Sequence, residues 1–303
     1  MFNNHREKPH ALKIMESLKS RMDLTSNHLN YYYALRKGWE GECQYDVMLE
    51  KLTCEHIIMK DLQLKVNRKS IQIDTLLITA NTIYLYEVKN YEGQYIHGDE
   101  GLTNCSTRNE IVNPYIQLSR AQVLFRQLLK QWNTNLRLDG FVVYINPHFT
   151  LYDTPHLRPY IFFNQIEGHI SQLNHQSKAL TEKHVLLSKK LEAMHNSELY
   201  TTDLPAYIYE ELKKGMFCGQ CQNTIEKLTK TIGCCKQCGF KEESSKSILR
   251  HIAEYSHLFP NQKITTKTVQ EWCVLPSKKR VRTVLDKHFK KQGSYRWRYY
   301  EIM

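Results

Sequence analysis

Residues 71–93 read IQIDTLLITANTIYLYEVKNYEG, and they carry the clearest structural signal in the chain. Two apolar runs are separated by an Ala-Asn pair at 80–81, which is typical of a turn, so the stretch predicts two neighbouring strands. Because side chains alternate across a strand, Glu87 and Lys89 share a face with apolar neighbours, and Asp74 does the same in the first run. Charged groups on an apolar face are costly unless they are paired or bound to a metal ion. The three charges therefore predict a site.

Two carboxylates and a lysine on adjacent strands are the groups that metal-assisted hydrolysis of a phosphodiester bond requires. Asp74 and Glu87, with the carbonyl of Val88, would hold Mg²⁺ or Mn²⁺, which polarises the phosphate and lowers the pKa of the attacking water. Lys89 would orient that water or stabilise the developing negative charge. A buried ion pair between Lys89 and one of the carboxylates, without catalysis, is the alternative.

Polar side chains on two predicted helices favour the site over the ion pair. In a helix predicted over residues 35–52, Glu42 lies on an apolar stripe, so a second acidic side chain faces the core. An Asn-Pro pair predicts a second helix that begins at Pro114 and ends near Trp132. Gln117 begins the apolar stripe of this helix, so we expect its amide to point inward. Glu42 would complete the metal shell or orient a ligand, and Gln117 would position water or phosphate.

The other predicted elements of this region complete a mixed α/β core. Strands are predicted at residues 57–66 and 141–145, with a shorter one at 160–163, and residues 94–112 are predicted to form a loop. The order is helix, three strands, helix, strand. Residues 166–214 are mainly helical and polar, and they contain no catalytic grouping.

Four segments resemble the successive motifs of the nuclease-related domain (NERD) family, which is grouped with the PD-(D/E)XK restriction-endonuclease-like superfamily. They are GWEGE at 38–42, QID at 72–74, EVKNYEG at 87–93 and NPYIQL at 113–118. The resemblance covers about residues 35–145 and implies a restriction-endonuclease-like αβββαβ core. It also implies metal-site roles for four residues, with Gln117 as an accessory: Glu42, Asp74, Glu87 and Lys89. In such proteins the domain is joined to zinc-ribbon or DNA-handling modules.

Five of the nine cysteines lie between residues 218 and 238. Two CxxC pairs, Cys218 with Cys221 and Cys235 with Cys238, are separated by 13 residues, a spacing that fits a four-thiolate zinc site in a small ribbon. Cys234 is an alternative to Cys235 as a ligand. A redox pair would need only one CxxC, and an odd number of cysteines does not suit a disulfide framework.

The C-terminal part of the chain is basic. Residues 241–303 hold 14 Lys or Arg against 6 Asp or Glu, which leaves 28 against 25 for the rest of a chain whose net charge is +11. Helices predicted over 245–258, 266–272 and 277–290, followed by a strand at 294–302, resemble a winged helix-turn-helix. A local basic excess favours a polyanion such as DNA or RNA.

The candidate nucleic-acid-binding residues lie at the start of the third of these helices and in the final strand. A solvated basic helix and a strand that packs in the core are the alternatives. The candidates are Lys278, Lys279, Arg280, Arg282, Arg296 and Arg298.

A chain of 303 residues with 41% hydrophobic content has enough material for more than one domain. We predict five segments. They are an N-terminal helical segment (1–34), the nuclease-like domain (35–165), a helical connector (166–215), the zinc ribbon (216–241) and a winged-helix-like basic domain (242–303).

The predicted function is that of a Mg²⁺-dependent DNA endonuclease or DNA-processing nuclease, with RNA as a second potential partner. One alternative is a non-catalytic nucleic-acid-binding protein built on the nuclease scaffold, and another is a structural zinc protein that acts through protein partners. The polar opening at residues 1–10 has no features of a secretory signal or a membrane anchor. We therefore expect a cytoplasmic protein.

Overall fold

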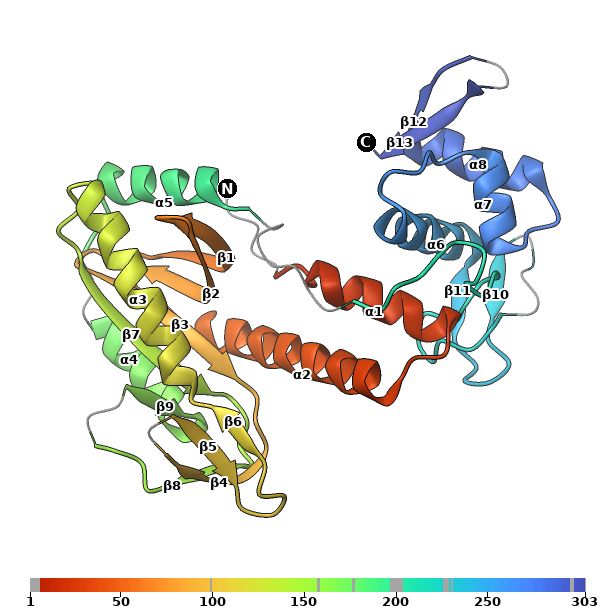
Figure 1. Ribbon diagram of the computed structural model, residues 1–303. Coiled ribbons are helices and arrows are strands. Elements are labelled where there is room, and N and C mark those ends of the chain that lie inside the picture. The colour runs from red at the N-terminus through yellow and green to blue at the C-terminus, as the bar shows by residue number, and fades with distance from the viewer. Residues whose placement is uncertain are drawn as a thin grey trace. The chain divides into compact units, whose positions relative to one another are not determined.

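The structure is a computed structural model that describes residues 6–98, 100–156, 159–175, 178–196, 204–225, 229, 231–294 and 297–302 (Figure 1). The chain forms two compact units. The first comprises Met1–Glu7 and Arg36–Thr202, and the second comprises Lys8–Leu35 and Asp203–Met303. The boundary after Leu35 falls within helix α2 (Ser26–Leu49), so this helix contributes residues to both units.

A five-stranded sheet forms the centre of the first unit, in the order β1-β2-β3-β7-β9. The first three strands are antiparallel neighbours, whereas β7 and β9 each run parallel to the strand before them in that order. Their bounds are β1 (Ile57–Val66), β2 (Lys69–Ile78), β3 (Thr82–Lys89), β7 (Arg137–Tyr144) and β9 (Tyr160–Phe162). Helix α2 precedes β1, and α3 (Pro114–Gln131) precedes β7. The predicted mixed α/β class is therefore confirmed, and the order helix, three strands, helix, strand holds for this sheet and these two helices.

Helices cover both faces of this sheet (Figure 1). Alternation along β3 places Ile83 and Leu85 in a core with leucines of α3 and α5 (Glu182–Met194). Tyr84 and Tyr86 lie on the opposite face, in a core with residues of α2 and α4 (Ile166–His175). Glu87 and Lys89 continue the first of these two faces, so the sheet directs them toward the α3 side.

The prediction of a loop over residues 94–112 is wrong, because this segment forms three short strands. With β8 (Phe149–Tyr152) they make a second sheet in the order β6-β5-β4-β8. The three are β4 (Gly93–His97), β5 (Gly101–Asn104) and β6 (Glu110–Val112). β4 is half exposed and pairs in parallel with β8, which lies far away in the sequence. A local apolar pattern does not record such a pairing.

The second unit combines the N-terminal helix α1 (His10–Arg21) with the C-terminal helices around one hydrophobic core. The helices are α6 (Ser244–Leu258), α7 (Thr266–Cys273) and α8 (Lys278–His288). Two hairpins accompany them, β10 (Ile232–Cys234) with β11 (Lys241–Glu243), and β12 (Phe289–Gln292) with β13 (Tyr299–Ile302). The three predicted C-terminal helices are confirmed, but the third ends at His288, and the residues after it form β12. Three helices followed by a hairpin is the element order of a winged helix.

Arg21 stabilises the core of the second unit. Its guanidinium donates to both carboxylate oxygens of Glu254 at 2.8 and 2.6 Å and to the Lys213 carbonyl at 2.7 Å. It also lies 3.7 Å from the centroid of the Trp272 ring. The charge is buried, paired and fully engaged, as a buried guanidinium requires. None of the described helices combines the length and the apolar character that crossing a membrane requires.

His169, on α4, gives the first unit a pH-dependent stability. Its ring contacts Tyr84 and Phe141, its Nε2 lies 2.9 Å from the Tyr86 hydroxyl, and burial lowers its pKa from 6.5 to about 4. Below about pH 6.5 the unfolded chain takes up a proton that the folded protein takes up only near pH 4, so stability falls across this window. We expect His169 to contribute a loss of about 2 kcal/mol in unfolding free energy between pH 7 and pH 5.

Urea unfolding at the two pH values tests this contribution. His169→Gln keeps a hydrogen-bonding group near Tyr86 but does not titrate, so its stability should fall less than that of the wild-type protein. An identical fall in both proteins would contradict the assignment.

Candidate active site and metal centres

The predicted site lies where β2 and β3 separate. Backbone pairing between the two strands ends at Thr75 and Tyr86. Just beyond this pair, the carboxylate of Asp74 accepts a hydrogen bond from the Val88 N–H at 2.8 Å. A buried N–H needs a partner, and here a side chain replaces the neighbouring strand. Asp74, which is 5% exposed, is thereby fixed at the point where β2 and β3 separate, called the fork from here on. A metal-binding role for the Val88 carbonyl stays a prediction.

Glu87 and Lys89 form an ion pair on the same side of β3. Lys89 Nζ lies 2.6 Å from Glu87 Oε1. Burial and the nearby Asp74 carboxylate raise the pKa of Glu87 to about 8. Burial alone would lower the pKa of Lys89, but Glu87 and Asp74 outweigh it and raise that pKa. Lys89 therefore keeps a positive charge at neutral pH.

Gln117 contacts the site without being buried. Its Oε1 lies 3.5 Å from Lys89 Nζ, so α3 does bring this amide to the ion pair. The residue is nevertheless exposed, and the prediction that it points into the core is wrong. The buried stripe of α3 passes from Pro114 to Leu118, so it leaves out Gln117. Gln117 thus lies at the edge of the stripe, where it reaches Lys89 and solvent.

Glu42 reaches the site from α2, where it is held by Arg6, a residue that the sequence analysis did not single out. The guanidinium of Arg6 donates to Glu42 Oε2 at 2.7 Å and to the two carboxylate oxygens of Asp46 at 3.0 and 3.1 Å. It also donates to the backbone carbonyl of Asp74 at 2.8 Å and to Thr75 Oγ1 at 2.9 Å. Arg6 therefore ties α2 to β2 at the residue that carries the candidate metal ligand.

Asp61 adds a further negative charge that the sequence analysis also missed. The pairing of β1 with β2 passes from Lys60–Thr75 to Leu62–Ile73, so Asp61 and Asp74 face each other at a break in the ladder. Asp61 has a φ of 48°, an unusual conformation for a residue other than glycine. Its charge helps to raise the pKa of Asp74, although burial is the main cause.

The pKa of Glu42 is also raised by burial and by nearby negative charge. Burial and then the Asp74 carboxylate raise the pKa of Glu42 to about 8, and Arg6 offsets part of this rise. Carboxylates with raised pKa values in one place are typical of functional sites, because such an arrangement is costly without a cation.

Gly41 explains how α2 comes close enough to present Glu42. A Cβ at this position would lie 2.5 Å from the Cβ of Asn90, the residue that follows β3. Asn90 in turn donates to the carbonyl of Lys37 at 2.9 Å and accepts from Asn146 at 3.1 Å. Only glycine permits this close approach of α2 to the end of β3.

The donor set fits a divalent cation such as Mg²⁺, which prefers carboxylate oxygens. Asp74 and Glu87 are buried, and Glu87 Oε1 accepts no well-aligned hydrogen bond from the described residues. In the arrangement seen here the carboxylates contact Lys89, Arg6 and the Val88 N–H instead of converging on one point. Within the described ranges, the four cysteines of the ribbon are the one group of three or more Cys, His, Asp or Glu residues whose ligand atoms all lie within 4.8 Å of one another.

Residues 37–145 match the family model of the nuclease-related domain, NERD. The match runs from the middle of α2 to the end of β7 and includes all five predicted site residues, but it excludes Arg6. The resemblance noted in the sequence is thereby confirmed. No curated protein and no solved structure gave a significant match to the chain.

Arg6 therefore lies outside the segment that matches the NERD model but forms hydrogen bonds with residues inside it. In Arg6→Ala, Glu42 and Asp46 lose a buried partner, so we expect the unfolding free energy of the first unit to fall by about 3–5 kcal/mol. Urea unfolding measures this loss. Arg36→Ala is the matched control, because Arg36 is 51% exposed and its ion pair with Glu40 is worth less than about 1 kcal/mol. Equal losses in the two variants would contradict the role of Arg6.

The four cysteines outside the NERD domain converge as predicted. Sγ of Cys218 lies 3.6 Å from that of Cys238, and Sγ of Cys221 lies 3.5 Å from that of Cys235. A tetrahedral zinc ion with Zn–S bonds of about 2.3 Å would require separations of about 3.8 Å. Cys234 is exposed and is not part of the group, which favours Cys235 as the ligand. The nine cysteines all fall within the described ranges, and none of them forms a disulfide.

The predicted nucleic-acid-binding residues differ in their exposure to solvent and in their hydrogen bonds. Lys278, Lys279 and Arg282 are exposed on α8, whereas Arg280 donates to the Thr229 carbonyl at 2.6 Å. Arg298 is half-buried, and Arg296 lies outside the described residues.

The aromatic residues of the C-terminal hairpin also separate into two environments. Tyr300 is buried and donates to Asp286 at 2.8 Å, so it packs in the core. Trp297, just before β13, is 78% exposed. An exposed indole next to basic residues is a suitable surface for stacking on a base.

Proposed function

We propose that this protein is a Mg²⁺-dependent nuclease that hydrolyses phosphodiester bonds in DNA, as an endonuclease or a DNA-processing enzyme. One observation carries the proposal: Asp74, Glu87 and Lys89 are neighbours where β2 and β3 separate, inside the segment that matches the NERD model. A buried acidic pair with an adjacent charged lysine has the composition that metal-assisted phosphodiester hydrolysis needs.

Each residue of the site has a distinct role in this proposal. Asp74 and Glu87 would hold the cation, which when bound polarises the phosphate and lowers the pKa of the attacking water. Lys89 would place its positive charge against the phosphate oxygens as negative charge develops, or orient the water. The Gln117 amide supports Lys89 through the 3.5 Å contact. Glu42, held by Arg6, would orient groups around the cation.

The second unit would hold the nucleic acid. A structural zinc ion bound by the four cysteines would fix the ribbon, and the exposed Lys278, Lys279 and Arg282 would contact phosphates from α8. The three helices and the following hairpin support this role, because in winged helices the third helix enters the major groove. RNA offers the same phosphates, so it is included in the test below.

A non-catalytic nucleic-acid-binding protein is the second candidate. It is favoured by the pairing within the site, where Lys89 contacts Glu87 at 2.6 Å and Arg6 contacts Glu42 at 2.7 Å. Such pairs would also stabilise a scaffold that has no need of a metal. Intact acidic groups and Lys89 favour catalysis, since a scaffold without activity does not require them.

A cleavage assay on a panel of substrates separates the two candidates. Supercoiled plasmid, linear duplex, single-stranded and branched DNA, and RNA would be incubated with the protein in Mg²⁺, Mn²⁺ or EDTA. The proposal predicts nicks or breaks that depend on the metal ion. Binding to these substrates without cleavage in either metal would favour the scaffold and overturn the nuclease assignment.

A further inference from the structure

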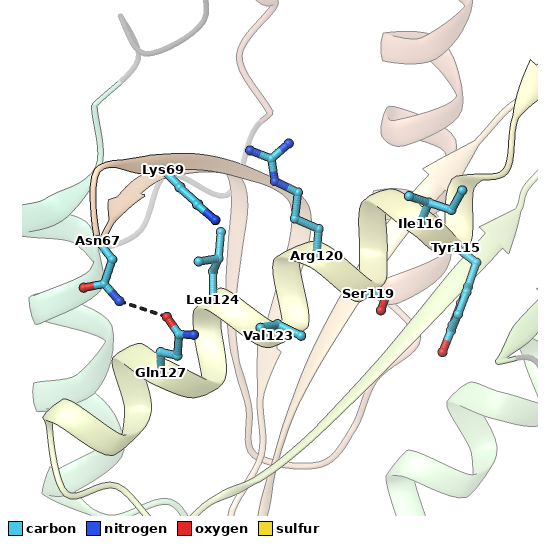
Figure 2. Close-up of a pocket in the computed structure, with 9 residues that line it drawn as sticks. All are labelled: Asn67, Lys69, Tyr115, Ile116, Ser119, Arg120, Val123, Leu124 and Gln127. Carbon is cyan, nitrogen blue, oxygen red and sulfur yellow. Dashed lines mark hydrogen bonds between the residues drawn. The ribbon is translucent and has the colours of Figure 1, made fainter. Parts of the chain in front are cut away.

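A pocket with a volume of about 580 Å³ lies between α3 and the turn that joins β1 to β2 (Figure 2). The turn contributes Asn67, the start of β2 contributes Lys69, and α3 contributes Ser119, Arg120 and Gln127. Asn67 Nδ2 donates to Gln127 Oε1 at 2.8 Å, a bond that ties the turn to the helix, as Figure 2 shows. The walls of the pocket therefore come from two elements that hold each other in place.

The pocket is lined by cationic, polar and apolar side chains, and no acidic residue lines it. Lys69 and Arg120 extend on the same side of α3 in Figure 2. Neither forms an ion pair with any residue in the described part of the chain. Two free cations beside hydroxyl and amide donors, without a compensating carboxylate, favour an anionic ligand.

The pocket begins next to the candidate active site. Arg120 follows Gln117 by three residues on α3, and residues at this spacing are neighbours on a helix surface, with Cβ atoms about 5–6 Å apart. Gln117 in turn contacts Lys89. Cationic and amide groups thus continue from the site along α3 into the pocket.

We propose that this pocket binds the phosphodiester backbone of a nucleic-acid strand next to the phosphate that is cut. The inference rests on the proposed function, because it takes the fork at Asp74 as the place of cleavage. Lys69 and Arg120 would contact phosphates. Ile116 and Val123, which also line the pocket and are 45% and 48% exposed, offer apolar surface for sugars or bases. Two cationic side chains from separate elements, next to exposed apolar side chains, suit a strand that carries several phosphates better than a single small anion.

A pair of charge-reversal variants on the full chain tests the proposal. The pocket variant is Lys69→Glu with Arg120→Glu, and the control is Arg126→Glu with Lys130→Glu. Arg126 and Lys130 are exposed on the same helix but do not line the pocket, so both variants change the net charge equally. Circular dichroism checks folding, and the milder Lys69→Gln with Arg120→Gln replaces the pocket variant if that one does not fold.

Fluorescence anisotropy with single-stranded and duplex DNA and with RNA, in Ca²⁺ instead of Mg²⁺, measures binding separately from cleavage. We expect the pocket variant to lose about tenfold or more in affinity and the control less than about threefold. Two lost phosphate contacts should also reduce the slope of log K against log salt by about 1.5. The DNA and RNA probes show which backbone the pocket prefers.

Equal losses in the two variants, or no binding by the wild-type protein, would overturn the pocket assignment. Failure of the proposed function gives a different result. If the wild-type protein binds through the pocket but cuts nothing in Mg²⁺ or Mn²⁺, the binding role of the pocket is supported and the proposed nuclease activity is contradicted. If the protein cuts DNA and the pocket variant binds like the control, the nuclease activity is supported and the binding role of the pocket is contradicted.

Discussion

Lys89→Ala should lower the rate of metal-dependent DNA cleavage by about 10²–10³-fold, the effect expected when a preorganised charge contact to the transition state is lost. The ammonium of Lys89 lies 2.6 Å from Glu87 and is kept charged by its two acidic neighbours. Its loss should affect kcat more than the affinity for DNA, because most phosphate contacts lie elsewhere. Single-turnover cleavage with excess enzyme measures the chemical step directly.

Lys37→Ala is the matched control for this variant. Lys37 also lies in the NERD segment, but its side chain is 45% exposed, and it pairs with the exposed Glu92 at 3.0 Å. Its loss should leave the cleavage rate within about twofold, since exposed ion pairs contribute little. Cleavage that persists at the wild-type rate in Lys89→Ala would show that the activity arises at another site.

Removal of the zinc ion proposed for the four-cysteine group should unfold the part of the second unit that surrounds it. Cys218 and Cys235 are each 1% exposed and belong to the same core as Ile248 and Trp272. Structural zinc contributes about 10–16 kcal/mol to the folding of small metal-binding domains, more than most whole domains have as net stability. We expect Cys218→Ser to lose zinc and a large part of the thermal transition of the second unit.

Cys234→Ser gives the control, because this thiol is adjacent in sequence but exposed and outside the four-cysteine group. Metal analysis of the purified wild-type and Cys234→Ser proteins should return about one zinc per chain, and that of Cys218→Ser should return much less. Native wild-type protein without zinc, or loss of zinc in Cys234→Ser alone, would contradict the assignment.

The parts of the fold that were predictable are those with a local signal. Alternating apolar residues located β1, β2 and β3, and the Asn-Pro pair located the start of α3, where the Asn113 side chain accepts from the Tyr115 N–H at 3.0 Å. The cysteine spacing identified the four residues whose sulfur atoms converge. In each case the residues that carry the signal also make the structure.

Other features depend on contacts between distant residues, which no local pattern records. The strands β4 to β6 are short, and their sheet needs β8 for completion. Arg6 is separated by 36 residues from Glu42 and by 69 from Thr75, so a single arginine in a polar segment gave no sign of its burial. The sequence did not indicate that Asp61 belongs to the site either, because its position opposite Asp74 depends on the register of β1 and β2.

We propose that the site between β2 and β3 binds a metal ion and cuts phosphodiester bonds. Asp74→Asn tests it most directly, because asparagine keeps the size of the side chain and an oxygen for the Val88 N–H but removes the negative charge. Cleavage of supercoiled plasmid in Mg²⁺ would be measured for wild-type and Asp74→Asn proteins purified in parallel. We expect the wild-type protein to nick the plasmid and the variant, although folded, to be at least about 10²-fold slower. Equal cleavage by the two proteins would contradict it.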